Sequence, residues 1–178
     1  MNKEFEQISK YLSYLLRHAP ESIGLRLDPN GWAYIADIIE KSTSPKMTKE
    51  LLQIVVETND KQRFSISRCG NKIRANQGHS VEIDLTLEPT IPPSVLLHGT
   101  AKRFMTSIMA EGISKQKRHH VHLSEADSVA NAVGARYGKP VILKVDAEQM
   151  AKDGFLFFKT ANNVWLVEHV PAKYLKCA

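Results

Sequence analysis

Hydrophobic residues recur at helical spacing over residues 3–18, where positions 5, 8, 11, 12, 15 and 16 are apolar or aromatic. A stripe of this period predicts an amphipathic helix with one face on a core. Pro20 disfavours helical geometry at the residue before it, so we expect the helix to end near residue 18. Two further helices are predicted, one with isoleucines at 35, 38 and 39, and one that begins near Thr48 as its N-cap.

The hydrophobic period then changes from that of a helix to that of a strand. Phe64 and Ile66 alternate with serines, Gly-Asn at 70–71 supplies a turn, and Ile73 and Ala75 continue on a return strand. Helices followed by a hairpin are typical of a winged-helix-like lobe. The alternative is a small α/β lobe with no role in nucleic-acid binding. Duplex DNA is disfavoured as a ligand, because residues 48–57 contain one base and two acids.

The second half of the chain predicts many short strands and few helices. Strands are expected at 95–97, 121–124, 141–145, 155–158 and 164–167. One helix is expected at 101–110, with apolar residues at 104, 105, 108 and 109 on one face, and another from Ser124 to about residue 133. This mixture indicates an α+β fold rather than a doubly wound sheet.

A proline-rich stretch at 88–93 separates two halves of different charge. Residues 1–88 hold 12 Lys and Arg against 12 Asp and Glu, whereas residues 89–178 hold 12 against 7 and carry the whole net charge of +5. Proline continues neither a helix nor a central strand, so we predict a linker here and two domains, 1–88 and 89–178. The positive charge makes a polyanionic partner a hypothesis to test.

Composition and motifs exclude several classes of protein. Two cysteines are too few for a disulfide framework, and no apolar run approaches the roughly 20 residues of a membrane span. Neither end resembles a targeting signal, and no heptad requires a partner, so a cytoplasmic monomer without membrane association is expected. The histidines at 98, 119, 120 and 122 lack an H-E-x-x-H pattern, and no metal site is predicted. Neither G-x-G-x-x-G nor a P-loop is present.

Two basic pairs in the first half admit two interpretations. Arg17 and His18 close the first predicted helix, and Lys61 and Arg63 precede the hairpin. The structural interpretation is that bases complement the helix dipole in a last turn and are solvated at a strand edge. The chemical interpretation is a phosphate site, because arginine binds phosphate through paired hydrogen bonds and histidine titrates near neutrality.

Seven motifs occur in a fixed order over nearly the whole chain. They are LRHAP at 16–20, GW at 31–32, KQRF at 61–64, RANQGHS at 74–80, LHGT at 97–100, VHLS at 121–124 and GAR at 134–136. Together they resemble the RNA 2′-phosphotransferases, enzymes related to the tRNA 2′-phosphotransferase that completes tRNA splicing in fungi. The resemblance implies an N-terminal winged-helix-like RNA-binding lobe and a C-terminal NAD-binding lobe of the ADP-ribosyltransferase fold.

The resemblance also implies a reaction and the residues that perform it. The 2′-phosphate of a tRNA-like RNA attacks the nicotinamide ribose of NAD, and the adjacent ribose hydroxyl then attacks the phosphodiester. The products are 2′-OH RNA, ADP-ribose 1″,2″-cyclic phosphate and nicotinamide. The implied catalytic residues are Arg17, His18, Arg63 and Arg136, supported by Lys61; the implied NAD contacts are His98, Gly99, Thr100, His122 and Ser124, with a third strand position near Val164.

Two alternatives to this function remain. The same residues would also suit transfer of ADP-ribose to a terminal phosphate of DNA or RNA without the second step. A winged-helix regulator that binds duplex DNA belongs to a different class, and the weak positive charge of residues 48–57 argues against it.

Overall fold

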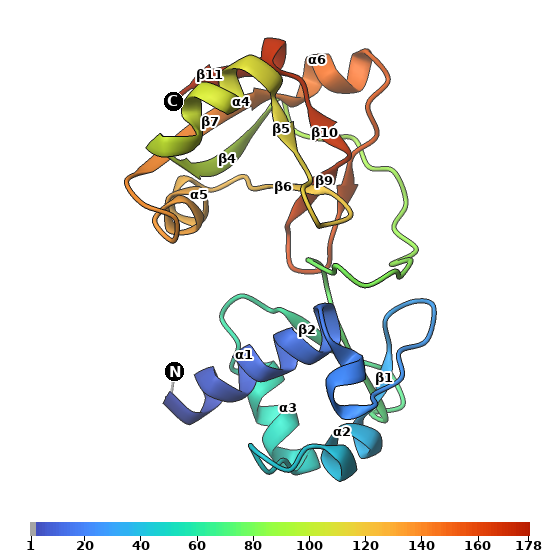
Figure 1. Cartoon of the computed structure of the whole chain (residues 1–178). Helices are drawn as coiled ribbons and strands as arrows, with labels where there is room; N and C mark the ends of the chain where they lie inside the picture. Colours follow the sequence, from blue (N-terminus) through green and yellow to red (C-terminus); the bar gives the residue numbers. More distant parts are fainter. Residues whose placement is uncertain (1–2) are drawn as a thin grey trace. The chain divides into compact units, whose positions relative to one another are not determined.

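The computed structural model describes residues 3–178, which divide into two compact units (Figure 1). The N-terminal unit extends to Thr86 and the C-terminal unit begins at Leu87. The described chain is a mixed α/β structure whose small sheets are antiparallel. Each unit encloses a hydrophobic core of its own. No helix among residues 3–178 combines the length and the apolar character that a membrane span requires.

The helices predicted for the N-terminal unit are confirmed. They are α1 (Lys3–Arg17), α2 (Ile35–Lys41) and α3 (Lys49–Glu57). Thr48 caps α3, because its side-chain oxygen accepts a hydrogen bond from a backbone N–H of the first turn at 3.2 Å. A short 3-10 helix, η1 (Pro20–Ile23), follows α1 at the proline that ends it.

The predicted hairpin is also present, and it belongs to a three-stranded sheet. β2 (Phe64–Ile66) pairs with β3 (Lys72–Ala75), and β1 (Ala33–Tyr34) pairs with the other edge of β3. β1 was not predicted, because two residues are too few to show an alternation.

The apolar stripe of α1 lies at the centre of the N-terminal core. Ile8, Leu12, Leu15 and Leu16 are all at most 1% exposed, and α3 and β3 pack against this helix. Full burial of each such side chain stabilises the fold by about 1.5–3 kcal/mol. The stripe therefore holds α1 firmly enough to position the polar groups at its end.

The strands of the C-terminal unit form three small sheets. β7 (Pro140–Asp146) is central to the first, between β4 (Val95–Ala101) and β11 (Leu175–Cys177). β9 (Trp165–Val167) is central to the second, between β6 (Val121–Leu123) and β8 (Phe158–Lys159). The third joins β5 (Ile113–Ser114) to β10 (His169–Val170). The proline-rich stretch lies along β8, where Thr90 N–H donates to Phe157 O at 2.7 Å.

The helices of this unit differ in detail from the expected pattern. They are η2 (Lys102–Phe104), α4 (Met105–Glu111), α5 (Asp127–Gly134), α6 (Ala147–Lys152) and η3 (Ala172–Tyr174). The single helix expected over 101–110 is thus a 3-10 turn followed by α4. Met105 and Ile108 pack against the core, but Phe104 and Met109 are 39% and 44% exposed. Residues 155–157 are not a strand, and α6 was not predicted.

Two glycines determine how closely α5 approaches β4, beside which it lies in Figure 1. A Cβ atom added to Gly99 would lie 1.7 Å from the carbonyl oxygen of Ala130, and one added to Gly134 would lie 2.4 Å from that of Thr100. The helix and strand backbones are therefore in direct contact, which only residues without a side chain permit.

Candidate functional site

Arg17 and His18 at the end of α1 are held by the loop that follows β3. The backbone N–H of Ser80 donates to Arg17 O at 2.8 Å, and Ser80 Oγ lies 2.9 Å from His18 Nδ1. Gly78 has a φ of +88°, and a Cβ atom there would lie 3.6 Å from the Arg17 guanidinium. Glycine thus supplies the left-handed conformation that brings the loop onto Arg17. The RANQGHS motif therefore organises the Arg17–His18 pair.

Arg63 is held by a buried polar cluster that the sequence does not reveal. Its guanidinium donates to Ser9 Oγ at 3.3 Å, and its backbone N–H donates to Asn59 Oδ1 at 3.3 Å. Asn59 also donates to Ser9 Oγ at 2.9 Å, and the two residues are 3% and 0% exposed. Because these partners are 50 positions apart in the chain, only the fold brings them together.

One segment connects the two basic sites of the N-terminal unit. The N–H of Asn76, directly after β3, donates to Arg63 O at 2.8 Å, and the chain continues from there to Ser80 beside Arg17. Along α1, the eight-residue spacing from Ser9 to Arg17 corresponds to a rise of about 12 Å. The unit therefore presents Arg17, His18 and Arg63 from one continuous framework. Lys61 is exposed at the approach to β2.

Ser9→Ala is expected to destabilise the N-terminal unit by about 1–3 kcal/mol, because the buried Asn59 amide and the Arg63 guanidinium lose an acceptor. Ser13→Ala is a matched control one turn further along α1. The Ser13 hydroxyl is buried with no hydrogen-bond partner, so its removal is expected to leave stability unchanged or raise it. Urea unfolding followed by circular dichroism measures both variants. Equal effects of the two substitutions would contradict the role given to Ser9.

In the C-terminal unit, β4 and β6 are joined through a bridge between Leu97 and Ser124. These residues exchange backbone hydrogen bonds of 2.8 and 2.9 Å. The bridge places His98 Nδ1 3.2 Å from the carbonyl oxygen of His122. A carbonyl only accepts, so Nδ1 carries the proton, and Nε2 of the neutral ring is an acceptor. Burial lowers the pKa of His98, and the nearby charge of Arg118 lowers it further, which favours the neutral ring at pH 7.

Arg118 imposes the opposite tautomer on His122. The Arg118 guanidinium nitrogen lies 3.1 Å from His122 Nδ1. A guanidinium only donates, so Nδ1 is the acceptor and the neutral ring carries its proton on Nε2. The two histidines therefore present one Nε2 acceptor and one Nε2 donor. In the sequence Arg118 is only one member of a basic loop, and nothing there distinguishes it.

Of the other predicted cofactor positions, Gly99, Thr100 and Ser124 lie in or next to β4 and β6, and Val164 lies elsewhere. Gly99 and Thr100 follow His98 in β4 and are both buried. Ser124 lies in the bridge itself, and its hydroxyl donates to Ala126 O at 3.3 Å. Val164 lies in the turn before β9, where its N–H donates to the Thr160 hydroxyl at 3.0 Å.

Glu125 connects the chain after Ser124 to the sheet of β9. It accepts hydrogen bonds from Trp165 Nε1 at 2.7 Å and from Lys159 Nζ at 3.1 Å. The Trp165 hydrogen bond, followed by that of Lys159, lowers the pKa of Glu125, so the carboxylate is ionised at neutral pH. These contacts hold the segment beside His122 in place.

Arg136 lies in the exposed turn between α5 and β7. The structure thus brings Arg17, His18 and Arg63 onto one framework in the N-terminal unit, and His98, Gly99, Thr100, His122 and Ser124 onto two joined strands in the C-terminal unit. Over residues 3–178, no group of three or more His, Cys, Asp or Glu side chains is arranged to hold a metal ion.

Comparison with known proteins supports the resemblance that the seven motifs indicated. The family model described as "RNA 2′-phosphotransferase, Tpt1 / KptA family" matches residues 3–169. The chain belongs to this family. Three relatives of this family member are each named "Probable RNA 2′-phosphotransferase". The Acaryochloris marina protein is 49% identical to this chain, and the match covers 98% of this chain and 97% of the relative. The Flavobacterium johnsoniae protein is 50% identical, with 96% of this chain and 95% of the relative covered. The Agrobacterium fabrum protein is 51% identical, with 94% of this chain and 91% of the relative covered. The family predicted from the sequence is confirmed.

Proposed function

We propose that this family member removes an internal 2′-phosphate from RNA and transfers it to NAD. A phosphate oxygen forms a bond to C1″ of the nicotinamide ribose as nicotinamide leaves, and the 2″-hydroxyl then displaces the RNA 2′-oxygen, which departs as 2′-OH. The match of the RNA 2′-phosphotransferase model to residues 3–169 carries the proposal, because that range contains every residue given a role.

In this proposal the N-terminal unit is a winged-helix-like RNA-binding lobe that holds the 2′-phosphate. A phosphate dianion is already a nucleophile, so it needs orientation rather than deprotonation. Arg17 and Arg63 supply charge-assisted donors, and His18 supplies a further ring N–H donor. The hydrogen bond from the Arg63 guanidinium to Ser9 Oγ supports this assignment, because it restricts the orientation of that side chain before substrate binds. The hydrogen bond from Ser80 N–H to Arg17 O fixes the backbone from which the Arg17 side chain extends.

The C-terminal unit is proposed to be an ADP-ribosyltransferase-like lobe that holds NAD as co-substrate. The His98 Nε2 acceptor suits a ribose hydroxyl, and the His122 Nε2–H donor suits an oxygen of the nucleotide. The backbone of Gly99 is proposed to contact the nicotinamide amide, with Thr100 and Ser124 adjacent. The neutral His98 ring fits this role, because it offers an acceptor without requiring a buried charge.

Arg136 and Arg63 are proposed to stabilise the charge that develops on the phosphoryl group in the second step. Preorganised donors aimed at a developing charge typically contribute about 10²–10³ in kcat each. Val164 at the third strand position suits a phosphate acceptor, because a carboxylate there would repel it. We further propose a tRNA-like RNA as the substrate, in keeping with tRNA splicing.

The deciding experiment uses an RNA with one internal 2′-phosphate, incubated with NAD. We expect nicotinamide release, a free 2′-OH and ADP-ribose 1″,2″-cyclic phosphate in equal amounts. Omission of NAD and an otherwise identical 2′-OH RNA are the controls. Loss of the phosphate without NAD would contradict the proposed co-substrate. A persistent ADP-ribosylated RNA would favour terminal-phosphate ADP-ribosylation, and tight duplex-DNA binding with no NAD consumption would favour a regulator.

A further inference from the structure

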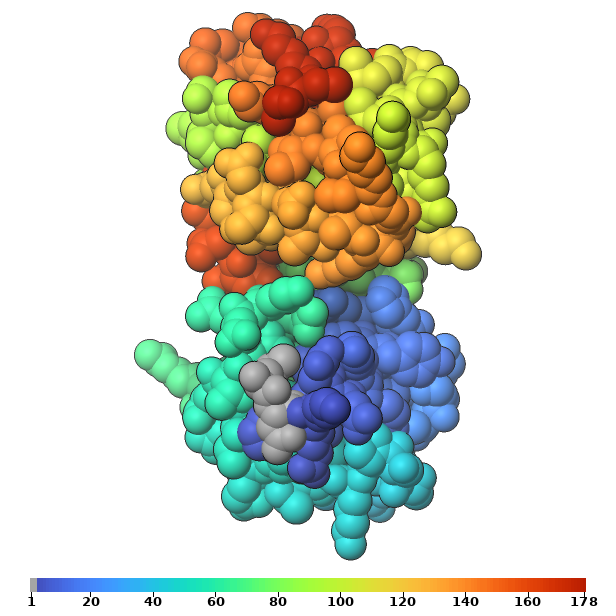
Figure 2. Space-filling model, turned by 90° about the vertical axis from the view of Figure 1, so that its left-hand side faces the viewer, coloured from blue at the N-terminus to red at the C-terminus, as the bar shows by residue number. Residues whose placement is uncertain are grey.

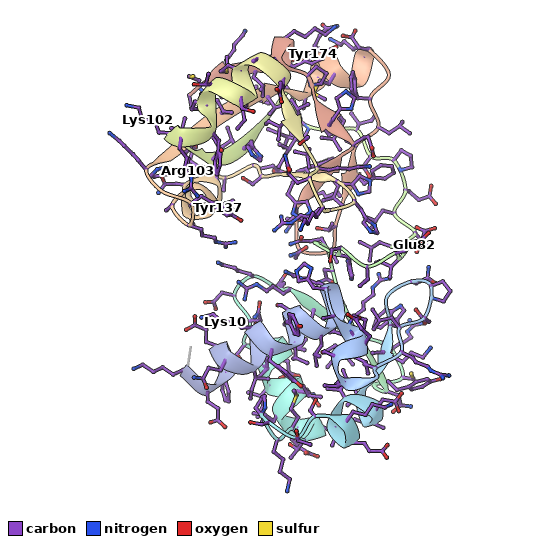
Figure 3. All side chains as sticks on the ribbon, in the orientation of Figure 1. Lys10, Glu82, Lys102, Arg103, Tyr137 and Tyr174 are labelled. Atoms are coloured by element: carbon purple, nitrogen blue, oxygen red, sulfur yellow. The ribbon has the colours of Figure 1, made fainter. Side chains whose placement is uncertain are left out.

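The C-terminal unit carries an exposed patch of cations and aromatic rings, of which the proposed chemistry uses only Arg136. We call it the basic-aromatic surface. All of its members are exposed, and they are Lys102, Arg103, Phe104, Arg136, Tyr137 and Lys139. Figure 3 labels Lys102, Arg103 and Tyr137 near one another on the left-hand side of this unit.

Backbone and side-chain contacts assemble this surface from two segments. The N–H of Lys102 donates to Lys139 O at 2.9 Å, which fixes η2 beside the start of β7. The Phe104 and Tyr137 rings meet edge to face with their centroids 6.4 Å apart, and the Arg103 guanidinium lies 4.7 Å from the Phe104 centroid. Figure 2 shows this side of the unit, where the segments around residue 105 (yellow-green) and residue 140 (orange) adjoin.

The two rings of this surface are partly exposed to solvent. Phe104 and Tyr137 are 39% and 46% exposed, whereas Met105 and Ile108 in the next turn pack against the core. Their edge-to-face contact and the Arg103 guanidinium over Phe104 hold the rings in place, and both rings keep an exposed part. Exposed, oriented rings among cations are the arrangement on which unpaired bases stack.

The charged side chains of this surface are all positive. Neither residues 97–110 nor residues 128–145 contain an Asp or Glu. Within the part of the chain that the structure describes, none of the four cations forms a salt bridge with a carboxylate. The C-terminal unit as a whole holds 12 Lys and Arg against 8 Asp and Glu. The surface therefore attracts a polyanion, and the aromatic rings restrict which polyanion it suits.

We propose that the basic-aromatic surface binds a single-stranded stretch of the RNA substrate next to the 2′-phosphate. This inference rests on the proposed function, because it extends the RNA site from Arg136 to its neighbour Tyr137 and across to Arg103 and Phe104. The rings stack on one or two unpaired bases, and the cations contact the flanking phosphates. A continuous duplex lacks exposed base faces, so single strands are preferred.

Direct binding tests this surface without any turnover. The probe is a fluorescent single-stranded RNA of about 12 nucleotides without a 2′-phosphate, within the usual range of single-strand site sizes. Phe104→Ala combined with Tyr137→Ala is expected to weaken binding by about 5- to 150-fold, the range for loss of a stacked base. Lys102→Gln combined with Arg103→Gln leaves the core untouched and is expected to reduce the slope of log K against log salt by about 1.4.

Lys144→Gln combined with Lys176→Gln is the matched control, because these exposed lysines are register partners on β7 and β11 and are not members of the surface. We expect its affinity for the RNA to be close to that of the wild type. In kinetics with a long 2′-phosphorylated RNA, the aromatic variant should raise KM for RNA and leave KM for NAD unchanged. Thermal melting checks that each variant is folded.

Three results would overturn the inference: unchanged RNA affinity in both surface variants, equal losses for single-stranded and duplex RNA, or a rise in KM for NAD alone. A rise in KM for NAD alone would indicate that the two rings contact NAD rather than RNA. Failure of the proposed function gives a different result, namely no turnover of 2′-phosphorylated RNA by the wild type. Because the binding measurement needs no 2′-phosphate, it tests the surface in either case.

Discussion

Arg63→Ala and Arg136→Ala are each expected to lower kcat on a 2′-phosphorylated RNA by about 100-fold or more. Each substitution removes a preorganised hydrogen-bond donor that stabilises the negative charge developing on the phosphoryl group in the transition state. Neither substitution should unfold the protein. After Arg63 is truncated, Asn59 still donates to Ser9 Oγ at 2.9 Å, and Arg136 is exposed. Nicotinamide release at saturating RNA and NAD measures kcat, and thermal melting measures the fold.

Two further variants separate charge from geometry. Arg68→Ala removes an exposed arginine from the same hairpin and is expected to retain the wild-type kcat. Arg63→Lys keeps the charge but loses the planar pair of donors, so an intermediate kcat is expected. Near-normal turnover of both Arg63→Ala and Arg136→Ala would contradict the roles assigned to these arginines.

Gly99→Ala and Gly134→Ala are each expected to destabilise the C-terminal unit by about 3 kcal/mol or more, at the upper end of overpacking effects. The added Cβ atoms would lie 1.7 and 2.4 Å from carbonyl oxygens of α5 and β4. These obstacles are backbone atoms rather than flexible side-chain ends, so the helix itself must move away from the strand. Gly154→Ala is the control, because nothing lies within 4 Å of its added Cβ although its φ is +96°. That strain alone is expected to cost about 1–2 kcal/mol.

Tryptophan fluorescence measures the stability of the C-terminal unit separately from that of the N-terminal unit. Trp32 lies in the N-terminal unit and Trp165 in the C-terminal unit, and these are the two tryptophans of the chain. In a Trp32→Phe background, urea unfolding followed at the buried Trp165 reports on the C-terminal unit. A wild-type midpoint for Gly134→Ala would contradict the close contact between α5 and β4. A loss of activity in Gly99→Ala is not evidence of an NAD contact unless this measurement shows that the unit is folded.

Periodicity predicted the elements that are long enough to show it. The stripe of α1, the cap of α3 and the alternation of the hairpin are local properties, and each was confirmed. Short or mixed segments were less predictable. Residues 102–104, expected as the start of a helix over 101–110, form a 3-10 turn instead, and residues 155–157 have the composition of a strand without being one. In these segments tertiary packing overrides local propensity.

For the candidate site, too, local features were predictable from the sequence and long-range contacts were not. The motifs placed Arg17, His18, Arg63 and His98 on the list of candidate residues, since residue type and order are visible in the chain. The groups that orient them were not visible. Ser9 and Asn59 stand 50 positions apart, and Ser80 acts on a histidine 62 positions away. Arg118 determines the tautomer of His122 through one contact of 3.1 Å that no pattern signals.

By itself, the sequence determined the family, the residue types of the candidate site and the longer helices and strands. These depend on composition, order and short-range period, which a linear chain displays directly. Only the tertiary structure decided which strands pair, how closely α5 lies on β4, and which hydrogen bond holds each candidate side chain. The net charge of +5 is visible in the sequence, but its concentration beside two exposed rings required the fold. The reason is physical: contacts between residues far apart in the chain depend on the whole packed core, and no local segment specifies them.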